Sequence, residues 1–215
     1  MPRSLIRSLI FLSGVMWFGS CNSYRHMQKS QPRENCVLQF KPEFYRVIYK
    51  TSADVKKIHI SGLLIIKKMS DNSTRILFTN EMGFPFFDFG FGADSGFTVY
   101  QITPDMNKKY LIKTLRKDFE LILFRNMDST SSYTLKDSQL VYHAYPQTGG
   151  GINYYVTDIP CRHLVKMQRA SEKKPVVEAS FPGNIYGNEP DSILIRHLNF
   201  NFTISLKKIT GLAAE

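Results

Sequence analysis

Apolar and polar residues alternate along most of the chain after Phe44, which is the pattern of half-buried β-strands. Turn-forming Gly, Pro, Asn, Asp and Ser residues separate the alternating segments, as expected for hairpins. Ten such segments can be distinguished: residues 44–55, 57–68, 75–80, 81–92, 97–102, 138–145, 151–158, 163–170, 175–181 and 192–209. About nine or ten strands in sequential antiparallel hairpins predict a single sheet, and a sheet of that length tends to curl on itself.

The last of these segments is expected to be one unbroken strand. Its apolar side would carry Leu198, Phe202 and Ile204, and its mainly polar side would carry His197.

One segment changes from the period of a strand to that of a helix. Between Lys109 and Phe124, apolar residues recur at spacings of four, four and three: Leu111, Leu115, Phe119 and Ile122. The opposite face is charged and carries Lys113, Arg116, Lys117 and Glu120. We therefore expect a mainly β fold, a strongly curved antiparallel sheet with one amphipathic helix packed on its concave side.

The segment "EMGFPFFDFGFG" places five phenylalanines within eight positions. In an extended strand, Phe84 and Phe86 point to one side and Phe87, Phe89 and Phe91 point to the other. Both sides can be ordinary core, or one row can line an apolar cavity beneath the helix while the other packs against loops. A register slip of one residue exchanges the two rows, so the sequence does not decide between them. The candidate cavity residues are Phe84, Phe86, Phe87, Phe89, Phe91, Leu111, Leu115 and Phe119.

The first 20 residues have the organisation of an export signal. A basic start is followed by the apolar run Leu9–Phe18 and by Gly19 and Ser20, directly before Cys21. The run is shorter than the roughly 20 residues that span a bilayer. The arrangement resembles the bacterial lipobox, whose cysteine becomes a lipidated N-terminus, although an ordinary cleaved signal or a short membrane anchor is the alternative. We expect a signal peptide over 1–20, a flexible tether over 21–35 after lipidated Cys21, and one domain over 36–215.

Two further cysteines, Cys36 and Cys161, lie near opposite ends of the expected domain. In an exported protein they either form a disulfide that closes a loop of about 125 residues or remain two free buried thiols. Their spacing does not suit a metal site.

The composition favours a binding or structural protein over an enzyme. The net charge of +10 comes from scattered Lys and Arg residues without a basic cluster interleaved with aromatics, so we expect a solvated basic surface and no nucleic-acid partner.

No phosphate-binding glycine loop, nucleophile motif or metal-binding motif is present, and we expect no enzymatic activity, cofactor or metal. His59, His143 and His197 are expected on polar sheet faces and not in a catalytic set.

A family resemblance is carried by two stretches, "HISGLLIIKKMSDNSTRILFTNEMGFPFFDFGFG" and "YLIKTLRKDFELILF". A glycine near the start of a long strand, a polar turn, an Arg-led strand, a glycine before an apolar strand and then one amphipathic helix follow in order. This order resembles the LolA/LolB-like lipoprotein carriers of the bacterial envelope, and it is similar to a group of Bacteroidota envelope lipoproteins. The resemblance implies a half-open β-barrel with an apolar cavity for acyl chains.

These inferences together predict a membrane-anchored envelope lipoprotein, on the periplasmic face of the outer membrane. It would bind lipidated or other apolar molecules and could act in lipoprotein trafficking, with acyl chains or lipoproteins as cargo. The alternative is a structural or protein-interaction module of the envelope whose sheet is filled by its own side chains. The sequence does not indicate an oligomeric state.

Overall fold

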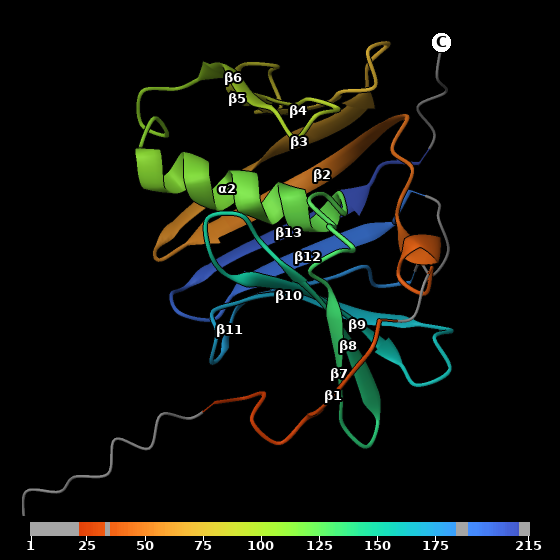
Figure 1. The fold of residues 1–215 in the computed structure, drawn as a ribbon. Helices are drawn as coiled ribbons and strands as arrows, with labels where there is room; N and C mark the ends of the chain where they lie inside the picture. The colour runs from red at the N-terminus through yellow and green to blue at the C-terminus, as the bar shows by residue number, and fades with distance from the viewer. Residues whose placement is uncertain (1–21, 33–34, 184–188, 211–215) are drawn as a thin grey trace, which may run out of the picture.

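The computed structural model describes residues 22–32, 35–183 and 189–210. The expected signal peptide and the expected lipidation site, Cys21, lie outside these residues. One antiparallel sheet of thirteen strands dominates the described chain, in the order β1-β7-β8-β9-β10-β11-β12-β13-β2-β3-β4-β5-β6 (Figure 1). Because β1 and β6 are edge strands, the curved sheet is not closed into a barrel. The predicted mainly β, half-open fold is confirmed.

The strand bounds are β1 Gln28–Ser30, β2 Arg46–Val55, β3 Ile58–Lys68, β4 Thr74–Thr79, β5 Pro85–Phe91, β6 Phe97–Ile102, β7 Tyr133–Lys136, β8 Leu140–Pro146, β9 Ile152–Asp158, β10 Leu164–Ala170, β11 Pro175–Ser180, β12 Ser192–His197 and β13 Phe202–Lys208.

The expected unbroken last strand is wrong, because residues 192–209 form a hairpin. β12 pairs antiparallel with β13, with Ile195 opposite Ile204, and the chain turns between His197 and Phe202. Asn199 and Asn201 lie in this turn, and asparagine favours turns. They mark the break between the two strands, which the alternation of apolar and polar residues does not show. The turn brings His197 to the buried side of the sheet, where a continuous strand would have left it on the polar side.

The expected flexible tether over 21–35 also needs correction. Residues 28–30 form β1, which pairs with β7, and the Tyr24 ring stacks on the Tyr154 ring with centroids 4.7 Å apart. Tyr154 and Tyr155 are neighbours in β9 and therefore point to opposite faces of the sheet. Tyr155 donates a hydrogen bond to the helix at Leu121 O, so Tyr154 and Tyr24 lie on the convex face. The described part of the N-terminal segment is folded against the sheet.

The helix α2, Lys109–Ile122, lies on the concave side of the sheet and crosses it diagonally (Figure 1). Leu115, Phe119 and Ile122 of the predicted stripe are buried, and the Phe119 ring packs against Phe87 and Phe91. The helix backbone approaches β10 and β11 more closely than it approaches the other strands. The predicted amphipathic helix and its packed face are confirmed.

A buried carboxylate fastens the second half of α2 to the sheet. Asp118 is fully buried, and its Oδ2 lies 2.8 Å from Nε2 of His197 in β12. Its Oδ1 lies 2.9 Å from Nη1 of Arg169 in β10, although the N–H direction does not make this contact a hydrogen bond. Because a buried charge is tolerated only with partners, these two residues fix where α2 sits.

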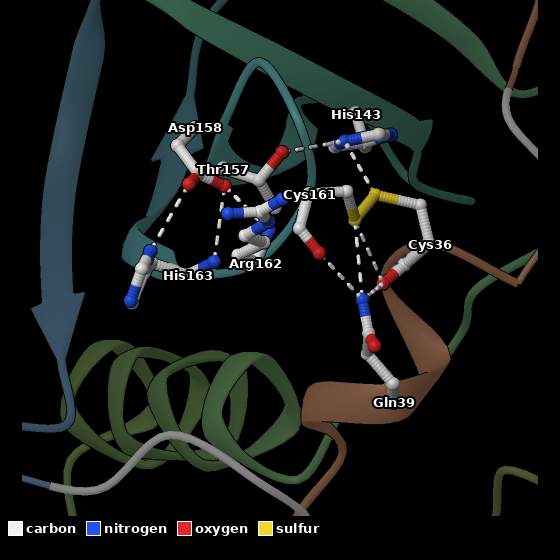
Figure 2. The surroundings of a disulfide bond; sticks show 8 residues. All are labelled: Cys36, Gln39, His143, Thr157, Asp158, Cys161, Arg162 and His163. Atoms are coloured by element: carbon white, nitrogen blue, oxygen red, sulfur yellow. Dashed lines mark hydrogen bonds and ion pairs between the residues drawn. A yellow bond between two sulfur atoms is a disulfide. The ribbon is translucent and has the colours of Figure 1, made fainter.

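A disulfide joins Cys36 and Cys161, which are 125 residues apart in sequence (Figure 2). Nε2 of Gln39 donates to the main-chain oxygens of both cysteines, at 3.0 and 2.8 Å. Gln39 belongs to the short 3-10 helix η1, Leu38–Phe40, whose Phe40 enters the main hydrophobic core. A disulfide that closes so long a loop lowers the conformational entropy of the unfolded chain. In the chain-entropy model, this stabilises the folded protein by about 4–5 kcal/mol.

The substitution Leu115→Asp tests the packing of α2. It places a charge without a partner in a buried contact, so we expect the free energy of unfolding to fall by several kcal/mol, measured by urea denaturation. Lys113→Asp is the matched control, because it places the same side chain on the exposed face of the same helix and should leave stability within about 0.5 kcal/mol. Equal stability of the Leu115→Asp variant and the parent would show that α2 is not part of the core.

Candidate functional site

An apolar cavity of about 550 Å³ lies beneath the first half of α2, between the helix and strands β2, β3 and β13. Its floor comes from the concave faces of these strands, its side wall from β4 and β5, and its roof from the helix. The lining residues are Thr51, Ala53, Val55, Ile58, Ile60, Leu64, Phe78, Phe86, Phe87, Thr103, Asp105, Met106, Tyr110, Leu111, Thr114, Leu115, Phe119, Phe200, Phe202 and Ile204.

The cavity exists because α2 is held close to the sheet at one end only. Asp118 holds its second half near β10 and β12, where Phe119, Leu121 and Ile122 fill the space beneath it. Under the first half, the floor on β2 consists of small side chains such as Ala53. Side chains of this size do not reach the helix, and an unfilled volume remains.

The inner wall of the cavity offers few polar groups. The hydroxyl of Thr51 donates to the main-chain oxygen of Tyr49 at 3.2 Å, so it is already hydrogen-bonded within the protein. Asp105 lies in the exposed loop before α2. A site with this lining recognises its ligand mainly by burial of apolar surface.

Large apolar side chains also surround the mouth of the cavity. Ile58 at the start of β3 is 64% exposed, Tyr110 in the first turn of α2 is 73% exposed, and Phe200 in the β12–β13 turn is 46% exposed. All three belong to the cavity lining. The apolar surface is therefore continuous from the interior of the cavity to the solvent.

The structure places the five phenylalanines differently from either predicted row. Phe86 and Phe87 both line the cavity, Phe89 and Phe91 are fully buried in packed core, and Phe84 is 64% exposed. The helix candidates Leu111, Leu115 and Phe119 all line the cavity.

A β-bulge explains why strict alternation fails here. Phe87 pairs with Phe78 and Pro85 pairs with Thr79, so Phe86 is an extra residue between two residue pairs. Two residues of a bulged strand oppose one residue of the partner strand. Both rings accordingly pack on Phe78, with centroids 5.0 and 5.6 Å away.

On the convex side of β5, Asp88 forms an ion pair with Arg75 of β4. Asp88 accepts two hydrogen bonds from the Arg75 guanidinium, at 2.8 and 2.7 Å. The Tyr100 ring covers this guanidinium, with its centroid 4.1 Å from the central carbon. The bidentate pair gives Asp88 a structural role and joins the outer surfaces of β4, β5 and β6.

The strand histidines do not form a common site. His59 pairs with Asp54 at the exposed β2–β3 hairpin, and His143 in β8 contacts Thr157 and the Cys36 sulfur. His197 pairs with Asp118, as described above. Within residues 22–32, 35–183 and 189–210, no group of three or more His, Cys, Asp or Glu residues is placed to hold a metal ion. In that same part of the chain, no helix has the length and apolar character needed to cross a membrane.

Comparison with known proteins identifies only distant similarity. No protein-family model matches the chain, and no curated protein does. Among solved structures, a DUF1329 family protein from Desulfovibrio piger is similar with a TM-score of 0.41 and 7% identity, over 84% of this chain and 92% of that one. A putative outer membrane lipoprotein-sorting protein domain from Vibrio parahaemolyticus is similar with a TM-score of 0.43 and 6% identity, over 80% of this chain and 88% of that one.

Truncation of two neighbouring phenylalanines separates the cavity wall from the core. Phe89→Ala removes a fully buried ring and should lower the free energy of unfolding by about 3–5 kcal/mol. Phe86→Ala removes a half-buried ring beside open space, and a loss of only about 1 kcal/mol is expected. Chemical denaturation measures both values. Equal losses would mean that Phe86 is packed as tightly as Phe89 and that the cavity is not open in solution.

Proposed function

We propose that this domain binds the acyl chain of a lipid or lipoprotein in the cavity beneath α2, and that it does so as a non-enzymatic, membrane-anchored envelope lipoprotein. The observation that carries the proposal is the cavity itself, whose lining is predominantly apolar and whose mouth opens between Ile58, Tyr110 and Phe200.

The physical properties of the cavity match this class of ligand. A volume of about 550 Å³ lies within the range of roughly 300–1,000 Å³ typical of small-molecule sites. Each methylene group that leaves water gains about 0.8 kcal/mol, so a chain of eight or more carbons binds by burial alone. The apolar mouth allows the rest of a large molecule to remain outside while its chain enters.

The anchoring part of the proposal rests on the sequence. An export signal followed by Cys21 supports a lipid-modified N-terminus in the cell envelope, and the order of elements resembles the LolA/LolB-like carriers. On this basis we assign the protein to the periplasmic face of the outer membrane, with acyl chains or lipoproteins as cargo. A role in lipoprotein trafficking is the most specific form of the proposal.

A protein-interaction module is the competing class. Such a module would use its outer surface and leave the cavity unoccupied. The two classes differ in whether substitutions inside the cavity change the binding of an apolar molecule.

Filling the cavity with an indole tests the proposal directly. The parent protein should bind a fluorescent fatty acid, such as a dansyl-labelled undecanoic acid, in a saturable manner. In the Ala53→Trp variant, the new side chain occupies the floor of the cavity. If the indole keeps two methylene groups of the fatty acid out of the cavity, the loss of burial is about 1.6 kcal/mol. The affinity for the fatty acid should then fall at least about tenfold in a fluorescence titration.

Leu194→Trp is the matched control for this test. Leu194 is 37% exposed on β12 and does not line the cavity, so the variant carries the same new indole outside the site. The affinity of the Leu194→Trp variant for the fatty acid should equal that of the parent. Absence of saturable binding by the parent, or unchanged affinity in Ala53→Trp, would contradict the proposal, provided that circular dichroism shows a folded variant.

The membrane anchor is tested by Cys21→Ala. A protein without the lipidated cysteine should move from the membrane fraction to the soluble periplasmic fraction after expression with its own signal. Fractionation followed by immunoblotting measures the shift. Unchanged membrane association would contradict lipidation at Cys21.

A further inference from the structure

A second concave site, with opposite chemistry, lies on the charged face of α2. Its volume is about 580 Å³. Its walls are the helix, the connection between β8 and β9, and the concave face of the sheet where β9 begins and β10 ends. Lys113, Arg116 and Lys117 come from the helix, Arg169 comes from β10, and Asn153 comes from β9.

The net charge of this site is positive. Four cationic side chains line it, Lys113, Arg116, Lys117 and Arg169, and Glu120 is the one carboxylate among its lining residues. With the buried Asp118 that pairs with Arg169 also counted, the difference is 4 − 2 = +2. Glu120 already accepts a hydrogen bond from Nε of Arg116 at 2.7 Å. A concave surface with this excess of positive charge concentrates anions.

The pKa of Lys117 reflects the same crowding. Partial burial lowers this pKa, and the positive charges of Arg169 and Lys113 lower it further. An anion bound among these residues would relieve their mutual repulsion.

One buried group of the site lacks a hydrogen-bond partner within the described part of the chain. Oδ1 of Asn153 has no donor there, although the Asn153 side chain is almost fully buried. Buried polar groups are normally paired, so this oxygen points to a ligand that offers a donor such as a hydroxyl. Nη1 of Arg169 is already held by Oδ1 of Asp118 at 2.9 Å, so an oxyanion would be bound by Lys113 and Lys117 of the helix.

The loop that closes this site is built from glycines. Gly149 and Gly150 have φ angles of +92° and +91°, which favour glycine, and a Cβ at either position would project into open space. At these two positions the wall opposite the helix has no side chain that would fill the site, while Gln147 and Thr148 of the same connection also line it.

We propose that this pocket binds a small molecule that carries an oxyanion and a hydroxyl next to each other. The oxyanion is a phosphate or a carboxylate group. Lys113 and Lys117 contact the oxyanion, and Asn153 accepts from the hydroxyl. The site is separate from the acyl-chain cavity, since the two share no lining residue. Its ligand is either a soluble metabolite-like anion or the headgroup of an anionic lipid, which present the same chemistry.

The test compares two double variants that remove equal charge. Lys113→Gln with Lys117→Gln removes two cations from the pocket, whereas Lys67→Gln with Lys68→Gln removes two from exposed positions at the end of β3 that do not line it. The probes for calorimetry are inorganic phosphate and glycerol 3-phosphate. Phosphatidylcholine vesicles with and without phosphatidylglycerol are the probes for sedimentation. Binding of the fluorescent fatty acid is measured in parallel.

We expect saturable binding of glycerol 3-phosphate, tighter than that of inorganic phosphate because of its hydroxyls. The pocket variant should bind about tenfold more weakly or worse, with the surface variant close to the parent. If glycerol 3-phosphate does not bind but the pocket variant alone loses binding to phosphatidylglycerol vesicles, the site is supported and its ligand is a headgroup.

Two results would overturn the anion site. One is the absence of saturable binding of all these probes, and the other is equal weakening in both double variants, which would indicate only the general basic charge. The fatty-acid titration keeps the two proposals separate, because the pocket variant should bind the fatty acid like the parent whatever the result with anions.

Discussion

The seating of α2 through buried Asp118 is the contact on which the rest of the structure depends. A fully buried carboxylate between His197 and Arg169 ties one point of the helix to two strands of the sheet. Removing one partner of a buried charge pair typically costs about 3–5 kcal/mol, so the helix has little freedom to settle elsewhere. The neighbouring ring of Phe119 then reaches Phe87 and Phe91 and completes the core at that point.

Both candidate sites follow from this one constraint. Because α2 approaches the sheet at its second half, its first half stands away from the small side chains of β2 and leaves the apolar cavity. Arg169 takes part in the contact with Asp118 and also lines the polar pocket on the other flank of the helix. The amphipathic character of α2 thus gives one apolar and one cationic site, on opposite sides of the same element.

The sequence predicts much of this fold but not the details of the site. Period-two alternation identifies the hairpins, and the spacing of Leu111, Leu115 and Phe119 identifies the buried face of the helix, because burial on one side imposes those periods. Alternation does not predict side-chain direction where a strand is irregular. One such place is the β-bulge that turns Phe86 to the same side as Phe87. Asp118 stands three residues after Leu115 on the apolar stripe, and a charge at that position is a visible signal of a buried contact. Its partners could not be identified, because they come from strands that only the folded sheet brings near.

Whether the cavity receives an apolar chain is the central claim, and mapping by nuclear magnetic resonance tests it most directly. With a doxyl-labelled fatty acid added to isotopically labelled protein, paramagnetic broadening should concentrate on the methyl groups of Ile60, Leu111 and Ile204, which line the cavity. Methyl groups of the core beneath the second half of α2, such as Leu121, should be much less affected. Broadening confined to exposed apolar residues outside the cavity, such as Met82 and Val165, or no broadening at all, would contradict the account.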